Sequence, residues 1–345
     1  MKILGIETSA DDTGVTLIDA NGSFGPDFHY SILSHAVSTQ TIHAGYGGIF
    51  PAMAKREHAA NLPLLFERVM AESKVDKIDA IAVTYGPGLE PCLWTGITFA
   101  QKLAEKWSTP IVATNHMEGH IVMAMMNGQR LAAFEFPALS LLISGGHTQL
   151  VLSGRFQQYK IVGNSRDDAV GEAYDKVARM LDLPYPGGPH ISKLAEEARA
   201  ADMRSEIKLP RPMIHEDNFD FSFSGLKTAV LRATENKQLS SDEKMTLARE
   251  FEDAAAEVIA VKTTRAIEEF GVATLVVGGG VSANTNIRRE LTKAAEEAGA
   301  KILLCEPKYS GDNALMIALA GYFHALNREF NPPADLKANG SLKLS

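Results

Sequence analysis

A two-part pattern occurs twice along the chain and constrains its fold more than any other feature. The first part, over residues 2–18 and again over 139–152, is typical of a β-hairpin with a polar tip. The second part, over 79–113 and 274–304, predicts a strand, a Gly-rich turn, a helix and a further strand. Strands that alternate with helices favour a parallel sheet. The sequence therefore predicts two related α/β lobes that face a shared cleft, although generic α/β patterning remains the alternative.

Three helices are predicted outside this pattern. Asp168 is expected to cap a helix that runs to about residue 183. Ser240 and Glu243 form a capping-box motif, which opens a long helix that ends before Gly271. A last helix is expected over residues 310–326.

Composition limits the class of protein. The 345 residues suit two domains of roughly 150 residues each, with 45% hydrophobic and 22% charged residues, as in ordinary globular proteins. The net charge of -8 argues against a surface wholly devoted to nucleic acid, but a local basic groove stays possible. Two cysteines, Cys92 and Cys305, fit a reducing compartment. No apolar segment approaches the roughly 18 residues of a membrane span, so a cytoplasmic protein is expected.

Two histidines four residues apart, His116 and His120, can lie on one helix face and reach one metal ion. Asp312, in the first turn of the last predicted helix, is a possible third ligand. Two histidines and one carboxylate suit Fe(II) or Zn(II). The order differs from His-Glu-x-x-His because Glu118 does not adjoin the first histidine, and a pair of surface or capping histidines is the alternative.

Two glycine turns are candidates for phosphate binding. Ser144-Gly-Gly146 and Gly278-Gly-Gly280 allow backbone N–H groups to approach an anion without an intervening Cβ. The second turn leads into a helix N-terminus, which also favours anions. Neither turn matches a P-loop or a dinucleotide-binding motif, and tight packing at a strand end is the alternative.

The tip of the first hairpin carries Thr8, Ser9, Asp11 and Asp12. Two adjacent carboxylates near a phosphate site suit contacts with metal-bound water or proton transfer. Such tips are also commonly polar for solubility alone.

Taken together, the motifs resemble those of the bacterial tRNA N6-adenosine threonylcarbamoyltransferase family over about residues 1–325. In chain order they are Gly5-Ile-Glu-Thr-Ser9 with Asp11, His116-Met-Glu-Gly-His120, Ser144-Gly-Gly-His-Thr-Gln149, Gly171-Glu-Ala-Tyr-Asp175-Lys176, Tyr185-Pro-Gly-Gly-Pro189, Asp220-Phe-Ser-Phe-Ser-Gly-Leu-Lys227, Gly278-Gly-Gly-Val-Ser-Ala-Asn284 and Asp312-Asn-Ala314. Each motif is modest alone, but eight in order are specific.

The resemblance implies the actin-like ATPase (sugar-kinase/Hsp70) superfold, with two duplicated α/β lobes around a central cleft. We expect an N-terminal lobe of residues 1–132 with about 311–330, and a C-terminal lobe of 133–310 with a helical insertion. Residues 331–345 are expected to form a loosely ordered tail.

The resemblance also implies an activity. The threonylcarbamoyl group would pass from L-threonylcarbamoyladenylate to N6 of adenosine 37 in tRNAs that read ANN codons, and AMP would leave. One Fe(II) or Zn(II) per subunit would be held by His116, His120 and Asp312. Thr8, Ser9 and Asp11 would face the reacting group, and Asp11 or Asp12 would accept the N6 proton. The adenylate would be held by Leu142, Ile143, Ser144, Gly145, Gly146, Asp175, Gly188 and Asn284, with Asp175 at the ribose hydroxyls.

Two positions depart from the family pattern. Ala10 stands where many relatives have cysteine, so no thiol chemistry is assigned there. Asp12 stands where some relatives have glutamate, and its carboxylate is one methylene shorter.

The implied partners are tRNA, a paralogous actin-like subunit, a P-loop ATPase and a synthase that supplies the adenylate, and no membrane is expected. Because the chain is acidic, we expect it to bind tRNA weakly alone and to share that affinity with its partners. A local basic patch is possible at Lys55, Arg56, Arg204, Lys208, Arg211 and Lys227. Three alternatives are a kinase of the same superfold, a zinc peptidase and a non-catalytic scaffold paralogue.

Overall fold

The computed structural model describes residues 1–344. The described chain divides into two compact units. Unit 1 consists of Met1–Ala133 together with Asp312–Leu344, and unit 2 consists of Phe134–Gly311. Unit 1 is thus built from both ends of the chain.

Unit 1 is organised around a sheet with the strand order β5-β4-β1-β2-β3-β7-β6. Strand β1 pairs antiparallel with β2 and parallel with β4, and β4 pairs parallel with β5. The strands are β1 (Lys2–Glu7), β2 (Asp12–Asn21), β3 (His29–Thr39), β4 (Ala80–Gly86), β5 (Ile111–Asn115), β6 (Met126–Asn127) and β7 (Arg130–Leu131).

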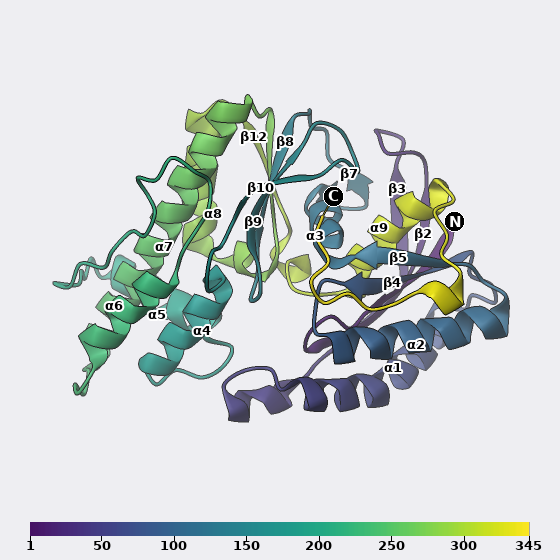
Figure 1. The fold of residues 1–345 in the computed structure, drawn as a ribbon, viewed down its shortest axis with the longest axis horizontal. Coiled ribbons are helices and arrows are strands. Elements are labelled where there is room, and N and C mark those ends of the chain that lie inside the picture. Colours follow the sequence, from purple (N-terminus) through teal and green to yellow (C-terminus); the bar gives the residue numbers. More distant parts are fainter. Residues whose placement is uncertain (345) are drawn as a thin grey trace. The chain divides into compact units, whose positions relative to one another are not determined.

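Helices cover both faces of this sheet (Figure 1). Helices α1 (Pro51–Ser73) and α2 (Glu90–Trp107) lie on one face, and α3 (His116–Ala124) and α9 (Ala314–Leu326) on the other. A short 3₁₀ helix, η1 (Thr41–Tyr46), precedes α1.

Helix α9 packs unusually close to the sheet of unit 1. A Cβ on Gly5 would collide with the backbone of Ala314, and one on Gly14 would lie 2.8 Å from the Ala314 amide nitrogen. These two glycines let the start of α9 rest directly on the first hairpin, because they present no side chain to it.

Unit 2 repeats the order of the first five strands of unit 1. Its sheet has the order β10-β9-β8-β11-β12, with β8 antiparallel to β9 and parallel to β11, and β11 parallel to β12. Strands β8 to β12 therefore correspond, one for one, to β1 to β5. The strands are β8 (Ala138–Ile143), β9 (Thr148–Ser153), β10 (Lys160–Asn164), β11 (Thr274–Gly278) and β12 (Lys301–Leu304). The predicted duplication is confirmed at the level of topology.

The helices of unit 2 share a hydrophobic core with its sheet. They are α4 (Val170–Met180), α5 (Gly187–Ala200), α6 (Ser224–Thr234), α7 (Ser241–Phe270) and α8 (Thr285–Glu297), with the 3₁₀ helices η2 (Gly280–Ala283) and η3 (Pro307–Tyr309). The predicted capping box is present, because the Ser240 hydroxyl accepts from the Glu243 amide and the Glu243 carboxylate accepts from the Ser240 amide. Helix α7 also ends at Gly271 as predicted.

Two predicted helix starts are wrong. The N-cap position of α4 is Ala169, which offers no side-chain cap, and the Asp168 carboxylate instead accepts from Lys176 and Lys227 at 2.8 Å each. Helix α9 begins after Asn313, whose side chain accepts from the Met316 amide. Asp312 consequently lies just before the last helix rather than in its first turn.

The predicted loosely ordered tail is instead packed against unit 1 over residues 331–344. Asn331 forms an antiparallel bridge with Ile111 of β5, and the 3₁₀ helix η4 (Pro333–Asp335) follows. Leu336 and Leu344 are buried, which anchors the segment. Ser345, the last residue of the predicted tail, lies outside the described residues.

Over residues 1–344, no helix combines the length and the apolar character that crossing a bilayer would require.

Candidate functional site

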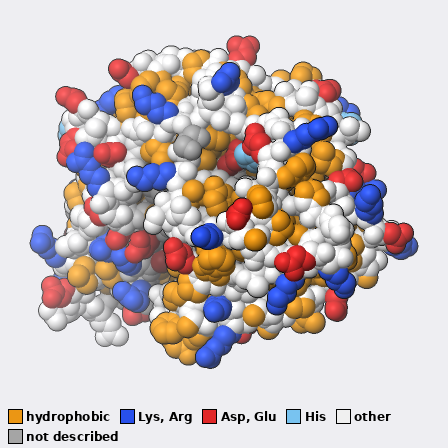
Figure 2. Space-filling view, turned by 45° about the vertical axis from the view of Figure 1, so that its right-hand side comes forward, with side chains coloured by type: hydrophobic (Ala, Val, Ile, Leu, Met, Phe, Trp, Pro, Cys, Tyr) orange, Lys and Arg blue, Asp and Glu red, His pale blue; other side chains and the backbone are white. Residues whose placement is uncertain are grey.

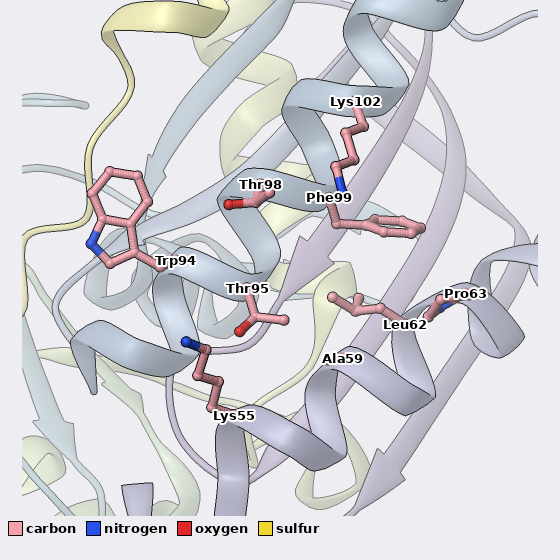
Figure 3. A pocket seen from close by; sticks show the side chains of 9 residues that line it. All are labelled: Lys55, Ala59, Leu62, Pro63, Trp94, Thr95, Thr98, Phe99 and Lys102. Carbon is pink, nitrogen blue, oxygen red and sulfur yellow. The ribbon is translucent and has the colours of Figure 1, made fainter. Parts of the chain in front are cut away.

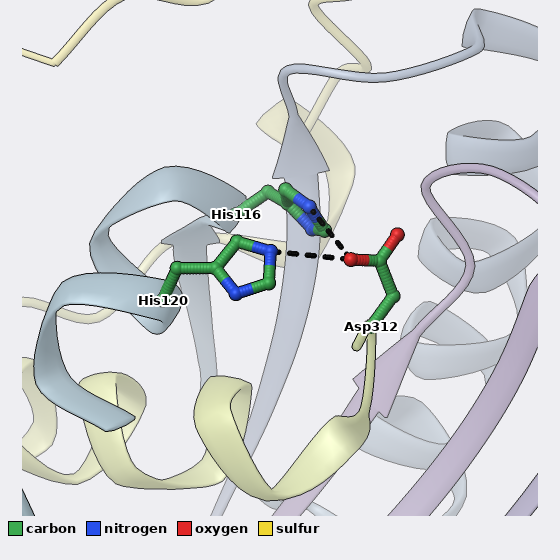
Figure 4. Close-up of side chains that lie close together, drawn as sticks. All are labelled: His116, His120 and Asp312. Carbon is green, nitrogen blue, oxygen red and sulfur yellow. Dashed lines mark hydrogen bonds and ion pairs between the residues drawn. The ribbon is translucent and has the colours of Figure 1, made fainter. Parts of the chain in front are cut away.

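His116, His120 and Asp312 converge in unit 1. The Asp312 Oδ1 atom lies 3.1 Å from His120 Nε2 and 3.4 Å from His116 Nε2 (Figure 4). Both histidines are buried, and ligand atoms of the three residues all lie within 4.8 Å of one another. The sequence suggested this grouping, and the structure brings together residues separated by almost 200 positions.

The spacing suits a small divalent cation. Metal–nitrogen and metal–oxygen distances of about 2.0–2.2 Å place neighbouring ligand atoms roughly 2.9–3.5 Å apart in tetrahedral or octahedral geometry. The two observed Nε2–Oδ1 distances fall in that range. The residues present therefore fit the implied metal.

Local structure explains how α3 reaches Asp312. The Asn115 side chain accepts from the amides of Met117 and Glu118 and so caps the helix at its first residue, His116. A Cβ on Gly119 would lie 3.1 Å from both the Ile317 and Met316 side chains of α9. Glycine at this position thus allows α3 and α9 to approach closely enough for His120 to meet Asp312.

Glu7 is a site residue that the sequence analysis missed. Its carboxylate is fully buried, lies 3.1 Å from His116 Nδ1 and accepts from the Thr84 hydroxyl at 2.6 Å. A carboxylate on one ring nitrogen fixes the ring so that the other nitrogen faces a metal, which is a recurring arrangement around metal-binding histidines. An acidic residue at the end of the apolar strand 2–7 was the available signal.

The carboxylates around His116 dominate its protonation. Burial by itself lowers the pKa of His116, but Asp312 and Glu7 overcome that effect and raise the pKa well above its usual value. Burial likewise disfavours charge on Asp312, whereas His116 and His120 hold the pKa of Asp312 well below its usual value. The carboxylates of Glu7 and Asp312 therefore favour positive charge between them. A protonated His116 provides that charge here, and a divalent cation bound at the cluster would provide it as well.

The four predicted hairpin-tip residues have different surroundings. The Ser9 hydroxyl lies 3.1 Å from His116 Nδ1, so Ser9 adjoins the cluster of His116, His120 and Asp312. The Thr8 hydroxyl instead donates to the Cys92 carbonyl of α2 at 3.0 Å, which is a structural contact. The Asp11 carbonyl accepts from the Gln40 amide at 3.2 Å.

Asp12 has the environment of a proton acceptor. Among the described residues, its Oδ1 atom is buried without a hydrogen-bond partner. Burial raises the pKa of Asp12 to about 7, against a hydrogen bond from Thr39 that lowers it. Three nearby carboxylates also raise this pKa: Asp312, Asp11 and Glu7. Asp12 is thus poised to change protonation near neutral pH.

In unit 2 the two glycine turns follow neighbouring parallel strands, because Gly278 of β11 pairs with Leu142 of β8. A Cβ on Gly279 would collide with the Ile143 carbonyl, and one on Gly171 would lie 2.6 Å from the Ser144 carbonyl oxygen. The turns and the start of α4 are therefore packed together.

Nothing described lies within 4 Å of a Cβ built on any of four other glycines: Gly145, Gly146, Gly188 and Gly280. The space beside each of these Cα atoms is open, although the Gly188 amide already donates to Asp175.

The remaining predicted adenylate residues are partly engaged within unit 2. Leu142 and Ile143 are fully buried in β8, so they offer only backbone groups. Asp175 accepts from the Gly187 amide at 2.6 Å, and burial raises its pKa. The Asn284 side chain caps α8 and donates to Ser192 and to Glu252, a buried acid that the sequence analysis missed. Any ligand contact by the Asn284 amide competes with these bonds.

Glu118 is held by helix α9. Its Oε2 atom lies 2.7 Å from His324 Nε2 of α9, and His324 also contacts Glu329. Burial opposes charge on His324, but the two carboxylates raise its pKa to about 9. This pairing leaves Glu118 ill placed for the base role that a zinc peptidase requires.

The apolar groove between α1 and α2 is separate from these residues. It has a volume of about 380 Å³ and is drawn in Figure 3. Its lining contains none of the predicted site residues and comprises Lys55, Ala59, Leu62, Pro63, Trp94, Thr95, Thr98, Phe99 and Lys102.

Most residues of the suggested basic patch have carboxylate neighbours. Positive and negative side chains are interspersed on the face shown in Figure 2. Four of the six suggested residues are paired with carboxylates: Arg204 with Asp202, Lys208 with Glu250, Arg211 with Glu250 and Glu257, and Lys227 with Asp168.

Comparisons with known proteins point to one family. The family model described as tRNA N6-adenosine threonylcarbamoyltransferase matches residues 31–319. The protein of that name from Aromatoleum aromaticum is 42% identical over 328 residues, which cover 94% of this chain and 92% of the relative. The one from Ralstonia pickettii is 42% identical over 329 residues, which cover 93% and 90%.

Solved structures agree on the fold. HypF from T. kodakarensis matches with a TM-score of 0.59 at 14% identity, over 97% of this chain and 48% of the HypF chain. Full-length HypF in a phosphate- and nucleotide-bound form matches with a TM-score of 0.56 at 12% identity, over 95% and 46%. This chain thus spans about half of either HypF chain. The likeness and the repeated strand order confirm the predicted actin-like α/β fold.

The His324 pair predicts a pH-dependent stability. Because the folded-state pKa of about 9 exceeds the usual value of about 6.5, protonated His324 stabilises the fold fully below pH 6.5. This contribution, on the order of 3 kcal/mol, is lost as the pH rises through 9. We expect the difference in unfolding free energy between the native chain and His324→Gln to shrink from pH 6.5 to pH 9.5.

Urea denaturation across this pH range measures the difference. The control is His215→Gln, at an exposed position, which should leave the pH profile of stability unchanged. A His324→Gln profile parallel to that of the native chain contradicts the prediction.

Proposed function

Because the chain belongs to the tRNA N6-adenosine threonylcarbamoyltransferase family, we propose that it makes threonylcarbamoyladenosine in tRNA. The donor is L-threonylcarbamoyladenylate, the acceptor is N6 of adenosine 37 in tRNAs that read ANN codons, and AMP is the leaving group. The observation that carries the proposal is the convergence of His116, His120 and Asp312 at a spacing suited to a metal.

The proposed reaction is an acyl transfer. N6 of the adenine forms a bond to the carbamoyl carbon, the bond between that carbon and the phosphate oxygen breaks, and AMP leaves with the electron pair. N6 loses one proton, for which Asp12 is the proposed acceptor because its pKa lies near 7.

The proposed cofactor is one Fe(II) or Zn(II) held by His116, His120 and Asp312. Such an ion supplies a Lewis acid that polarises the threonylcarbamoyl end of the donor. The chain's own part is orientation: Glu7 and Ser9 engage His116 Nδ1 and leave Nε2 directed at Asp312.

In unit 2 the open backbones of Gly145, Gly146 and Gly188 are the proposed cradle for the adenylate. The start of α5 adds the positive end of a helix dipole. We propose Asp175 for the ribose hydroxyls, since one carboxylate can accept from Gly187 and from a ligand at the same time.

Partners complete the proposal. A chain with a net charge of -8, in which four of the six suggested basic residues are paired with carboxylates, is expected to hold tRNA weakly by itself. We propose that a paralogous actin-like subunit and a P-loop ATPase share this task, and that a separate synthase supplies the adenylate.

The alternatives drawn from the sequence have less support. A kinase needs Mg²⁺ on oxygen ligands rather than two buried histidines. A peptidase needs a free glutamate, but His324 binds Glu118. A scaffold paralogue has no use for the metal cluster.

The proposed activity is tested by incubating the purified chain and its partners with L-threonylcarbamoyladenylate and unmodified tRNA. Mass spectrometry of the digested tRNA should show threonylcarbamoyladenosine, and chromatography should show an equal amount of AMP. His120→Ala should abolish both products. Absence of the modified nucleoside, with ATP-dependent phosphorylation or peptide cleavage in its place, would overturn the proposal.

The proposed adenylate cradle is tested by Gly145→Val. No described atom lies near the added Cβ, so the fold should persist, while the side chain should block the ligand. We expect the KM for the adenylate to rise at least about tenfold, an effect of roughly 1.4 kcal/mol, with an unchanged melting temperature. Gly154→Val, which also adds a side chain in open space, is the matched control. Equal KM values for the two variants would contradict the cradle.

The proposed proton acceptor is tested by Asp12→Asn, which keeps the size of the side chain and removes its basicity. Single-turnover transfer should slow by about 10²–10⁴-fold, the usual contribution of a general base. Asp11→Asn should cause a smaller loss. The reverse ranking would assign the role to Asp11, and undiminished transfer by Asp12→Asn would remove Asp12 from the mechanism.

A further inference from the structure

The segment of residues 331–344, here called the strap, runs along unit 1 in a way that the sequence did not predict. At its start, the Asn331 amide donates to the Ile111 carbonyl at 2.9 Å and its side chain accepts from the Ala113 amide at 2.8 Å. Gln101 of α2 then donates to the Pro333 carbonyl at 2.6 Å. Leu336 is buried in the hydrophobic core of unit 1. The first half of the strap is therefore firmly anchored.

The second half of the strap is bound to the turn that follows β4. The Asn339 amide donates to the Tyr85 carbonyl at 2.8 Å, and the Gly88 amide donates to the Gly340 carbonyl at 3.2 Å. Gly86 fits beneath the strap only because it lacks a side chain: a Cβ there would collide with the Asn339 carbonyl oxygen. These are backbone contacts, which explains why side-chain patterns gave no sign of them.

The same turn touches the metal cluster. The Leu89 amide donates to the Ser9 carbonyl at 2.8 Å, and a Cβ on Gly88 would lie 2.7 Å from that carbonyl oxygen. The Ser9 hydroxyl in turn contacts His116 Nδ1 at 3.1 Å. Further along the strap, the Lys343 carbonyl receives a longer contact, 3.5 Å, from the side chain of Asn115, which caps α3. The strap thus contacts the turn that binds Ser9 and the Asn115 side chain that caps α3, and both Ser9 and Asn115 adjoin His116.

We propose that Asn339, Gly340 and Lys343 of the strap are positioning residues for the metal centre, acting on His116 through the 86–88 turn with Ser9 and through Asn115. The inference rests on the metal site of the proposed function. It assigns a role to a segment that lies beyond residues 31–319, the part matched by the family model.

The test measures Co²⁺ binding to the metal-free protein by its visible absorption, so that it does not depend on transferase activity. A chain that ends at Ala338 keeps the Leu336 anchor and lacks the second half of the strap. Residues that hydrogen-bond to a metal ligand without touching the metal commonly change metal affinity 10–100-fold. The strap is one step further away, so its loss should lower Co²⁺ affinity about 3–10-fold. We expect this loss of Co²⁺ affinity with a melting temperature within a few degrees of the native value.

A second variant displaces the strap without shortening the chain. A Cβ on Gly340 would lie 2.8 Å from the Gly88 carbonyl oxygen, so Gly340→Val should push the strap from the turn and weaken Co²⁺ binding similarly. Ser341→Val, at the next and exposed position, is the matched control and should bind Co²⁺ as the native chain does.

The outcomes separate the two proposals. Native Co²⁺ affinity in both the shortened chain and Gly340→Val overturns the role of the strap and leaves the metal site standing. Equal weakening by Gly340→Val and Ser341→Val also overturns it. Failure of the native chain to bind Co²⁺ removes the metal site and the strap inference together.

Discussion

The close packing of α9 on the first hairpin is the contact on which unit 1 depends. Gly5 and Gly14 allow the start of α9 to lie on β1 and β2, and the helix is buried along nearly its whole length. This places Asp312, which immediately precedes the cap of α9, beside the histidines of α3. A side chain at Gly5 would displace the start of α9 from the sheet and, with it, the neighbouring Asp312, because one contact positions both.

The two units use one topology for different chemistry. In unit 1 the turn after β1 carries carboxylates and hydroxyls, and the buried Glu7 orients His116. In unit 2 the equivalent turn after β8 carries Gly145 and Gly146, whose backbones are open. The shared order of β1–β5 and β8–β12 therefore places carboxylates and hydroxyls at the first hairpin tip in unit 1, and glycine amides at the corresponding tip in unit 2.

The sequence was informative where local chemistry decides the structure. The repeated hairpins, the Ser240 capping box and the His116–His120 spacing depend on near neighbours and were predicted. Tertiary contacts decided the rest. Asp168 is bound by lysines rather than capping α4, and Asn284 already holds Glu252. The strap docks through backbone atoms, which no side-chain pattern reveals.

Because unit 1 is assembled from both ends of the chain, it can be completed only near the end of synthesis. In sequence, residues 134–311 of unit 2 lie between the two segments of unit 1, and its sheet can form once residue 304 has left the ribosome. The β1–β5 sheet has to wait, with one apolar face uncovered, until α9 emerges. Asp312 arrives just before that helix, so the cluster of His116, His120 and Asp312 is completed late in synthesis, and a chain terminated before residue 312 lacks one of its three members.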